Sequence, residues 1–203
     1  RARAQIKELE AAAGSIEDFY HSLRMQALVT PFDEAQLPRI AQLIGKTNQF
    51  NLTTRRHGMP QLTAFIRSSD YVHLALRLRD RYTDHGLVSV MIARCEGELL
   101  DIDTWLMSCR VIGRTVEATM LEHLCRHAAQ LGCTVLQGTY IPTQKNAMAA
   151  EVYAKHGFEP FNQVKEQHLW RYDLKARGPI ANPFVKSVAA WDSVSYCGSS
   201  SLL

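Results

Sequence analysis

The sequence predicts an α/β (α+β) fold built on one mixed sheet. Residues 1–45 carry apolar side chains at helical spacing, residues 71–109 carry the short apolar runs of strands, and residues 116–131 again have helical periodicity. A chain of 203 residues that is 46% hydrophobic is large enough for one sizeable core. The order of helices, strands, helix, strand, helix and strands therefore predicts helices packed against a mixed sheet.

The first third of the chain reads as a series of helices. Gly14 interrupts the first helix, and Ser15 is a suitable N-cap for a second. A third helix is expected from Asp33 to Gly45, because the apolar residues between them share one face. After a polar stretch, Pro60 is expected to open a short helix.

The middle of the chain reads as strands followed by one long helix. Strands are expected over 72–81, 87–95 and 99–109, the last two joined by a tight turn. An amphipathic helix is expected over 116–131, and a further strand over 134–141.

The last part of the chain combines one helix, two strands and a tail. Thr143 can cap a helix that runs to His156, and strands are expected near 158–161 and 167–174. From Arg177 onward the composition is rich in Gly, Pro and Ser, and we expect an extended or disordered tail.

Composition excludes several classes of function. A net charge of +3 gives no reason to expect nucleic acid as a partner. No apolar run approaches the ~18 residues of a membrane span, so no membrane association is expected. The chain has no initiator Met, and we expect it to be a piece of a longer protein.

The five cysteines favour free thiols. Their number is odd and no two are spaced as CxxC, so neither a disulfide framework nor a zinc site is expected, and the localisation expected is cytoplasmic. His123 and His127 stand four residues apart but lack the HExxH pattern and a third ligand, so no metal is expected.

The stretch 108–117 carries the strongest chemical signal. An expected strand turns through Gly113 into an expected helix, which aims backbone N–H groups and the positive end of a helix dipole at the turn. Arg110 and Arg114 add positive charge there, and Cys109 adds a thiol. This combination predicts a site for a phosphorylated group beside a nucleophilic sulfur.

Two motifs resemble those of GNAT acyltransferases. Arg110-x-x-Gly113-x-Thr115 is similar to their pyrophosphate loop, and the run from Asn146 through Tyr153 to a Gly-Phe pair is similar to their second signature. The resemblance implies a mixed, mostly antiparallel sheet flanked by helices, a loop backbone that binds coenzyme A, and Tyr153 as general acid. Asn146 is then a contact to the pantetheine arm or a backbone clamp.

Thr115 departs from the GNAT pattern, which prefers Gly or Ala at that position. A Cβ there narrows the space for a diphosphate. The phosphopantetheine arm of a carrier protein has a single phosphate, so it is the alternative to coenzyme A.

A narrower resemblance is to the C-terminal half of FkbH-like proteins of polyketide biosynthesis. It is carried by residues 46–56, 103–114 and 142–147 within about 15–175. It implies transfer of a glyceryl unit derived from 1,3-bisphosphoglycerate to an acyl carrier protein. The N-terminal HAD-type phosphatase domain of those proteins is not present in this chain and is an expected partner.

The resemblances imply an organisation into three parts: an N-terminal helical extension with a polar pocket-lining loop at 1–66, a GNAT-like acyltransferase domain at 67–176, and the tail at 177–203. They also imply roles for particular residues. Cys109 would carry the acyl group as a thioester, and Asn48 and Asn51 would line the acceptor pocket.

Plain structural roles stay open beside these functional ones. Cys109 can be a small buried residue at a strand end, Arg110 and Arg114 ordinary surface charges, and Tyr153 a core residue. Two other functions also stay open: a conventional GNAT N-acyltransferase with direct transfer from acyl-CoA, and a non-catalytic docking module for a carrier protein.

Overall fold

The computed structural model describes residues 13–191. They form an eight-stranded sheet in the order β6-β7-β5-β4-β3-β2-β1-β8. The strands are β1 (Met25–Thr30), β2 (Tyr71–Arg79), β3 (Asp84–Glu96), β4 (Leu99–Met107), β5 (Val135–Tyr140), β6 (Glu159–Val164), β7 (Gln167–Asp173) and β8 (Val185–Ser187). Among the strand pairs of the described residues, only β4–β5 and β1–β8 are parallel.

The α-helices of the described residues are α2 (Ile16–Leu23), α3 (Leu37–Lys46), α4 (Met59–Arg67), α5 (Val116–Leu131), α6 (Val152–Lys155) and α7 (Leu174–Arg177). There are also two short 3₁₀ turns: η1 (Cys109–Val111) follows β4, and η2 (Ala147–Ala149) precedes α6. The expected first helix lies outside the described residues. The mixed, mostly antiparallel fold predicted from the sequence is confirmed.

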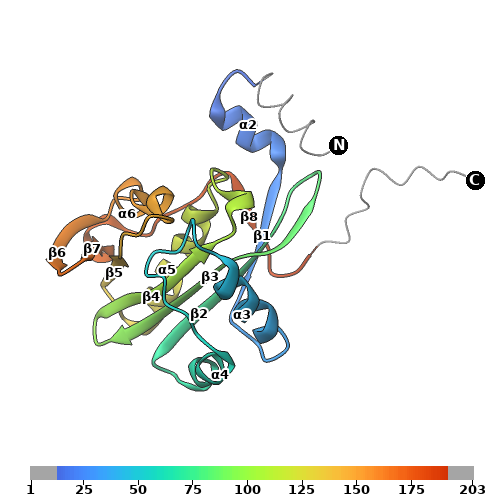
Figure 1. Cartoon of the computed structure of the whole chain (residues 1–203). Helices are drawn as coiled ribbons and strands as arrows, with labels where there is room; N and C mark the ends of the chain where they lie inside the picture. The colour runs from blue at the N-terminus through green and yellow to red at the C-terminus, as the bar shows by residue number, and fades with distance from the viewer. Residues whose placement is uncertain (1–12, 192–203) are drawn as a thin grey trace, which may run out of the picture.

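The helices cover both faces of the sheet. One core joins α2 and α5 to one face, and a second, smaller core joins α3 and α4 to the other. Alternation along β2 explains this division, because Leu74 and Leu76 lie in the first core and Ala75 lies in the second. Figure 1 shows α3 and α4 together on one side, and β6 and β7 at the far edge from β1.

Helix α5 follows the sequence prediction at both ends. It runs from Val116 to Leu131, and Gly132 caps it with a φ of 76°, a conformation that glycine adopts without strain. Its buried residues recur at helical spacing and pack on the first core. Ser15 likewise caps α2, since its Oγ accepts the Asp18 N–H at 3.1 Å.

Three expectations need correction. The first third of the chain is not all helical, because β1 lies in it and pairs with β2 in the main sheet. The tail is not wholly extended or disordered, because β8 pairs with β1 and follows α7. The helix expected from Thr143 to His156 is replaced by η2 and the short α6.

Candidate functional site

Strands β4 and β5 pair only over the first four residues of each. The parallel register runs from Leu99–Val135 to Ile102–Gly138, and beyond it the two strands are bridged by other residues. We call residues 50–52 the inserted segment. Its Leu52 N–H donates to Trp105 O at 3.1 Å, and its Leu52 O accepts the Ile141 N–H at 2.8 Å. The inserted segment thus connects the diverging strands like a short extra strand.

Asn146 holds the inserted segment in place. Its side-chain amide donates to Asn51 O and Ile141 O, both at 2.9 Å, and its Oδ1 accepts the Thr143 N–H at 2.7 Å. Asn146 and Asn51 are both fully buried. Of the two roles that the sequence left open for Asn146, the structure therefore shows the backbone clamp. Its buried side chain is fully used there and is not free to contact a bound arm. Its use of Thr143 also explains why no continuous helix forms from that residue.

Asn51 differs from the expectation for an acceptor pocket. Its Oδ1 accepts the Thr54 N–H at 2.9 Å, and its Nδ2 lies 3.4 Å from Thr47 O. Both ends of the amide are used inside the protein, so Asn51 shapes the loop and lines neither of the two pockets described next.

A pocket of about 780 Å³ contains Cys109, and we call it the thiol pocket. Four cationic side chains line it: Arg39, Lys46, Arg110 and Lys145. None of the four forms an ion pair within residues 13–191, and no carboxylate from that range lines the pocket. Unpaired cations gathered around a cavity attract an anionic ligand or partner surface. Cys109 is exposed among them.

Four amide side chains also line the thiol pocket, together with the hydroxyl residues Thr47 and Ser108. Gln42 comes from α3, Asn48 and Gln49 come from the loop just before the inserted segment, and Gln144 comes from the turn after β5. Asn48 therefore lies on the thiol pocket, where its Oδ1 also accepts a hydrogen bond from Arg56 at 2.5 Å. Arg110 Nε donates to Ser108 Oγ at 3.2 Å, so both residues of this bond lie on the pocket lining.

The thiol does not lie at the N-terminus of α5. Cys109 begins the 3₁₀ turn η1, and α5 starts only at Val116. That helix end opens instead on a second pocket of about 490 Å³, which we call the helix pocket. Gly113 and Thr115 line the helix pocket, so the structure separates them from Cys109 and Arg110. The single phosphate site expected from the sequence is thus divided between two pockets.

The helix pocket is poor in free positive charge. Lys155 pairs with Glu151 at 2.9 Å, and burial lowers the pKa of His156. Glu117 lies at the start of α5, where burial raises the pKa of its carboxyl. A phosphate in this pocket would depend on backbone N–H groups of the turn rather than on cationic side chains.

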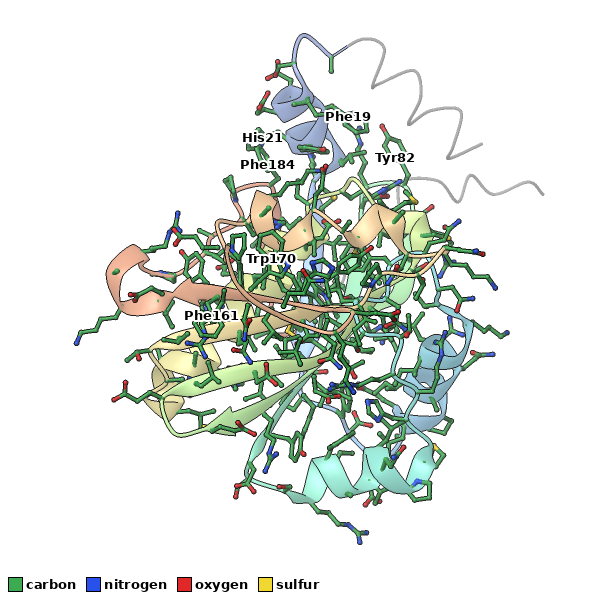
Figure 2. The ribbon with its side chains drawn as sticks, turned by 60° about the vertical axis from the view of Figure 1, so that its left-hand side comes forward. Phe19, His21, Tyr82, Phe161, Trp170 and Phe184 are labelled. Carbon is green, nitrogen blue, oxygen red and sulfur yellow. The ribbon has the colours of Figure 1, made fainter. Side chains whose placement is uncertain are left out.

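Thr115 has an unusual conformation for a β-branched residue. Its φ is 57°, in the left-handed region that favours glycine. The C-terminal segment stabilises it, because the Asn182 side-chain amide donates to Thr115 O at 2.6 Å and to Thr119 Oγ1 at 2.8 Å. The same segment brings Phe184 against Tyr20, at 5.3 Å between ring centroids, and His21 of α2 lies beside Phe184 (Figure 2).

Arg114 is turned away from both pockets. Its guanidinium donates to Asp80 Oδ2 at 2.5 Å, and the Asp80 side chain is fully buried. His85 Nε2 lies 2.8 Å from the same oxygen. The structure therefore does not bring Arg114 to either pocket, and its charge ties the turn before α5 to the β2–β3 connection.

Tyr153 lies in the core. Its side chain is fully buried, its ring centroid is 5.0 Å from that of Phe158, and it packs against Gly138. Burial, followed by the charge of Asp101, raises the pKa of its hydroxyl. The hydroxyl makes no hydrogen bond of normal geometry with the described residues and opens on neither pocket. The structure therefore favours the packing role over the role of general acid.

Sequence reasoning missed three of the four cationic side chains around the thiol, Arg39, Lys46 and Lys145. Arg39 and Lys46 lie one above the other on α3, seven residues apart, and Lys145 comes from the turn after β5. The seven-residue spacing on a predicted helix was the available signal, but the placement of α3 beside η1 could not be derived from it.

Other features of the described residues limit the chemistry. Within residues 13–191 no helix is long and apolar enough to cross a membrane. In the same range, no three His, Cys, Asp or Glu side chains gather closely enough to hold a metal ion.

Comparisons with known proteins place the fold. No protein-family model matches the chain, and no curated protein matches it. Among solved structures, the chain is similar to the GNAT domain of S. lividans PAT, with a TM-score of 0.58 and 16% identity over 72% of this chain and 89% of that one.

Two further structures agree. The ribosomal-protein-S18-alanine N-acetyltransferase of Escherichia coli gives a TM-score of 0.53 and 12% identity over 84% of this chain and 99% of that one. The PaiA N-acetyltransferase of Thermoplasma acidophilum, in complex with coenzyme A, gives a TM-score of 0.54 and 10% identity over 73% of this chain and 99% of that one. At these identities the likeness concerns the fold, and the chain has the GNAT fold.

Proposed function

We propose that this chain is an acyltransferase module that moves a glyceryl-type acyl group onto the phosphopantetheine thiol of an acyl carrier protein. The observation that carries the proposal is the exposed thiol of Cys109 inside a pocket with four unpaired cations. The GNAT fold and the resemblance to FkbH-like proteins supply the reaction class and the acyl group.

Cys109 serves as the transient acyl carrier. Its sulfur attacks the carbonyl carbon of the incoming acyl group, the bond to the donor's leaving group breaks, and a thioester forms on Cys109. The pantetheine thiolate then attacks that thioester and Cys109 leaves as a thiolate. Exchange between thioesters is nearly balanced in free energy, so the site contributes mainly by positioning the reacting groups.

The lining side chains have matching roles. Arg110 and the amides of Asn48 and Gln144 offer donors for the oxyanion that develops at the carbonyl. Lys46 and Lys145 attract the phosphate of the arm or an acidic carrier surface. The pocket lining includes neither His nor carboxylate from residues 13–191, so thiol protons exchange with solvent at the open mouth.

A HAD-type phosphatase is a proposed partner. A glyceryl unit that reaches this site from a phosphorylated precursor must lose its phosphate, and residues 13–191 hold no cluster of metal-ligating side chains for that step. A HAD-type domain, as in FkbH-like proteins, would supply it.

Direct N-acylation from acyl-CoA is the second candidate. It is favoured by the likeness to N-acetyltransferases, one of which was solved with coenzyme A, and by the turn of Gly113 and Thr115 at the start of α5. Coenzyme A brings three phosphates, whereas the carrier arm brings one. A clear rise in the melting temperature with acetyl-CoA, and none with a phosphopantetheine-bearing carrier, would favour this candidate.

Transfer between two carriers tests the proposal. Glyceryl-loaded carrier is mixed with an unloaded carrier of different mass, and the acyl group on the second carrier is followed by mass spectrometry. We expect transfer with the wild type, none with Cys109→Ala, and full transfer with Cys95→Ala. Lys46→Glu should slow transfer, while Lys175→Glu, which changes a charge on α7 away from the pocket, should not. Equal transfer by wild type and Cys109→Ala would refute the covalent route.

A further inference from the structure

Two thiols outside the proposed site face each other across the sheet end. Cys95 lies near the end of β3 and Cys133 lies between α5 and β5. Their Sγ atoms are 3.5 Å apart. Both lie near the carbonyl oxygen of Gly97, at 3.7 Å and 3.6 Å. They are thirty-eight residues apart in the sequence, so only the fold brings them together.

The backbone on both sides of the pair is firmly held. Cys95 N–H donates to Asp70 O and Cys133 N–H donates to Ala128 O, both at 2.8 Å. The Thr134 N–H also donates to Glu98 O at 2.8 Å, which ties the β3–β4 turn to the chain after Cys133. A disulfide bond is about 2.05 Å long, so the two sulfurs need to approach by roughly 1.5 Å, within the reach of side-chain rotation.

We propose that Cys95 and Cys133 form a reversible intramolecular disulfide when the chain meets a low-molecular-weight disulfide such as oxidised glutathione. The Cys95 thiolate attacks one sulfur of the oxidant, a mixed disulfide forms, and one glutathione thiolate leaves. Cys133 then attacks the Cys95 sulfur, gives up its proton to solvent, and displaces the second glutathione. Two protein thiols are oxidised and one small disulfide is reduced to two thiols.

The order of the two steps follows from exposure. Cys133 is 3% exposed, whereas Cys95 is partly exposed and accessible to a small oxidant. Burial, together with the neighbouring Cys95 thiol, raises the pKa of Cys133 to about 11. Once Cys95 is joined to glutathione, it can no longer ionise beside Cys133, and the second thiol becomes easier to deprotonate.

The bond would close residues 95–133 into a loop that contains β4, Cys109 and the whole of α5. It would lie where the β4–β5 pairing begins, at Leu99 and Val135. A covalent closure of this length restricts the unfolded chain and stabilises the fold. The expected consequence is a more stable protein under oxidising conditions. This proposal does not depend on the acyl-transfer proposal.

The test uses the full chain with Cys109→Ser and Cys197→Ser, so that neither of these two thiols competes. After treatment with oxidised glutathione and removal of excess reagent, intact mass should fall by about 2 Da and peptide mapping should join Cys95 to Cys133. The melting temperature should rise by roughly 5–10 °C and return on reduction.

A third substitution separates the two chemical steps. With Cys133→Ser added, Cys95 should instead keep a glutathione adduct of about 305 Da, because no second thiol can displace it. With Cys95→Ser added, no adduct is expected on the buried Cys133. The proposal is overturned if the chain with both thiols keeps the glutathione adduct, remains unmodified, or forms only bonds between two chains.

Discussion

Substitution of Gly138 by Ala tests the packing where β4 and β5 begin to diverge. A Cβ built at this position would lie 2.2 Å from Tyr153 Cζ, 2.3 Å from Cε1 and 2.7 Å from Oη. Carbon atoms in van der Waals contact are separated by about 3.5 Å, so the ring must move by more than an ångström. Trp105 and Trp170 surround the same ring, with centroids 6.0 Å and 6.5 Å away.

The cost follows from overpacking. An extra methyl group forced into a packed core lowers the free energy of unfolding by about 1–3 kcal/mol. The close contacts of the added Cβ with the Tyr153 ring place this substitution at the upper end of that range. Because alanine has less conformational entropy than glycine in the unfolded chain, the substitution also stabilises the fold by about 0.5 kcal/mol. We expect a net loss near 2 kcal/mol in the free energy of unfolding, or roughly 4–8 °C in melting temperature for a chain of this size.

Urea unfolding of matched variants measures this loss. Gly45→Ala is the control, because Gly45 lies in α3 with no atom within 4 Å of the added Cβ. That substitution should be neutral or stabilise by about 0.5 kcal/mol. Tyr153→Ala removes the clashing ring, so Gly138→Ala should cost at least about 1 kcal/mol less in that background. Equal stability of Gly138→Ala and Gly45→Ala would refute the packing described for Tyr153.

Three further predictions concern Asp80, Asn146 and Thr115. Burial raises the pKa of Asp80, but hydrogen bonds from His85, the Tyr82 backbone N–H and Arg114 outweigh it, and the net pKa is lowered. The stability that this carboxylate contributes is therefore present above pH ~4 and lost as the pH falls through its folded pKa. Asp80→Asn should lower the free energy of unfolding by about 3 kcal/mol at pH 7 and flatten the acid side of a plot of urea midpoint against pH. An unchanged acid side of that plot would contradict this prediction. Asn146→Leu leaves three backbone groups without partners and should lower the free energy of unfolding by at least ~3 kcal/mol. Thermal unfolding measures this change, and a loss under ~1 kcal/mol would exclude the clamp. Thr115→Gly removes the Cβ beside the turn, so coenzyme A should raise its melting temperature more than that of the wild type; equal shifts would show that Thr115 does not limit the helix pocket.

Local sequence patterns predicted the parts of the fold that depend on local physics. The apolar periodicity of 116–131 and its closing Gly132 gave α5 correctly, because both the helix and its cap are determined within a few residues. The hairpin between β3 and β4 was likewise readable from the short Glu96–Glu98 turn. The mixed sheet followed from the order of these elements.

Long-range contacts explain what the sequence did not predict. β1 has six residues between two helices, and its strand character depends on pairing with β2, forty-five or more residues later in the chain. Asn146 looked like part of a helix, but its side chain instead binds the backbone of Asn51. The approach of Cys95 to Cys133 likewise requires the fold.

The candidate site was predicted in part. The sequence singled out Cys109, Arg110 and Asn48, and the structure places all three on the thiol pocket. It also assigned Arg114 and Tyr153 to the site, and the structure uses one in an ion pair with Asp80 and the other in the core. A sequence motif identifies which turn is present, but the packing of that turn decides which of its side chains reach a pocket.

The central claim is that Cys109 carries the acyl group. The most direct measurement is the intact mass of the chain after brief incubation with glyceryl-loaded carrier protein, for wild type beside Cys109→Ala. We predict an adduct of about 88 Da on the wild type that maps to Cys109 and is removed by hydroxylamine, as expected for a thioester. An adduct of the same yield on Cys109→Ala, or transfer without any adduct, would contradict the account.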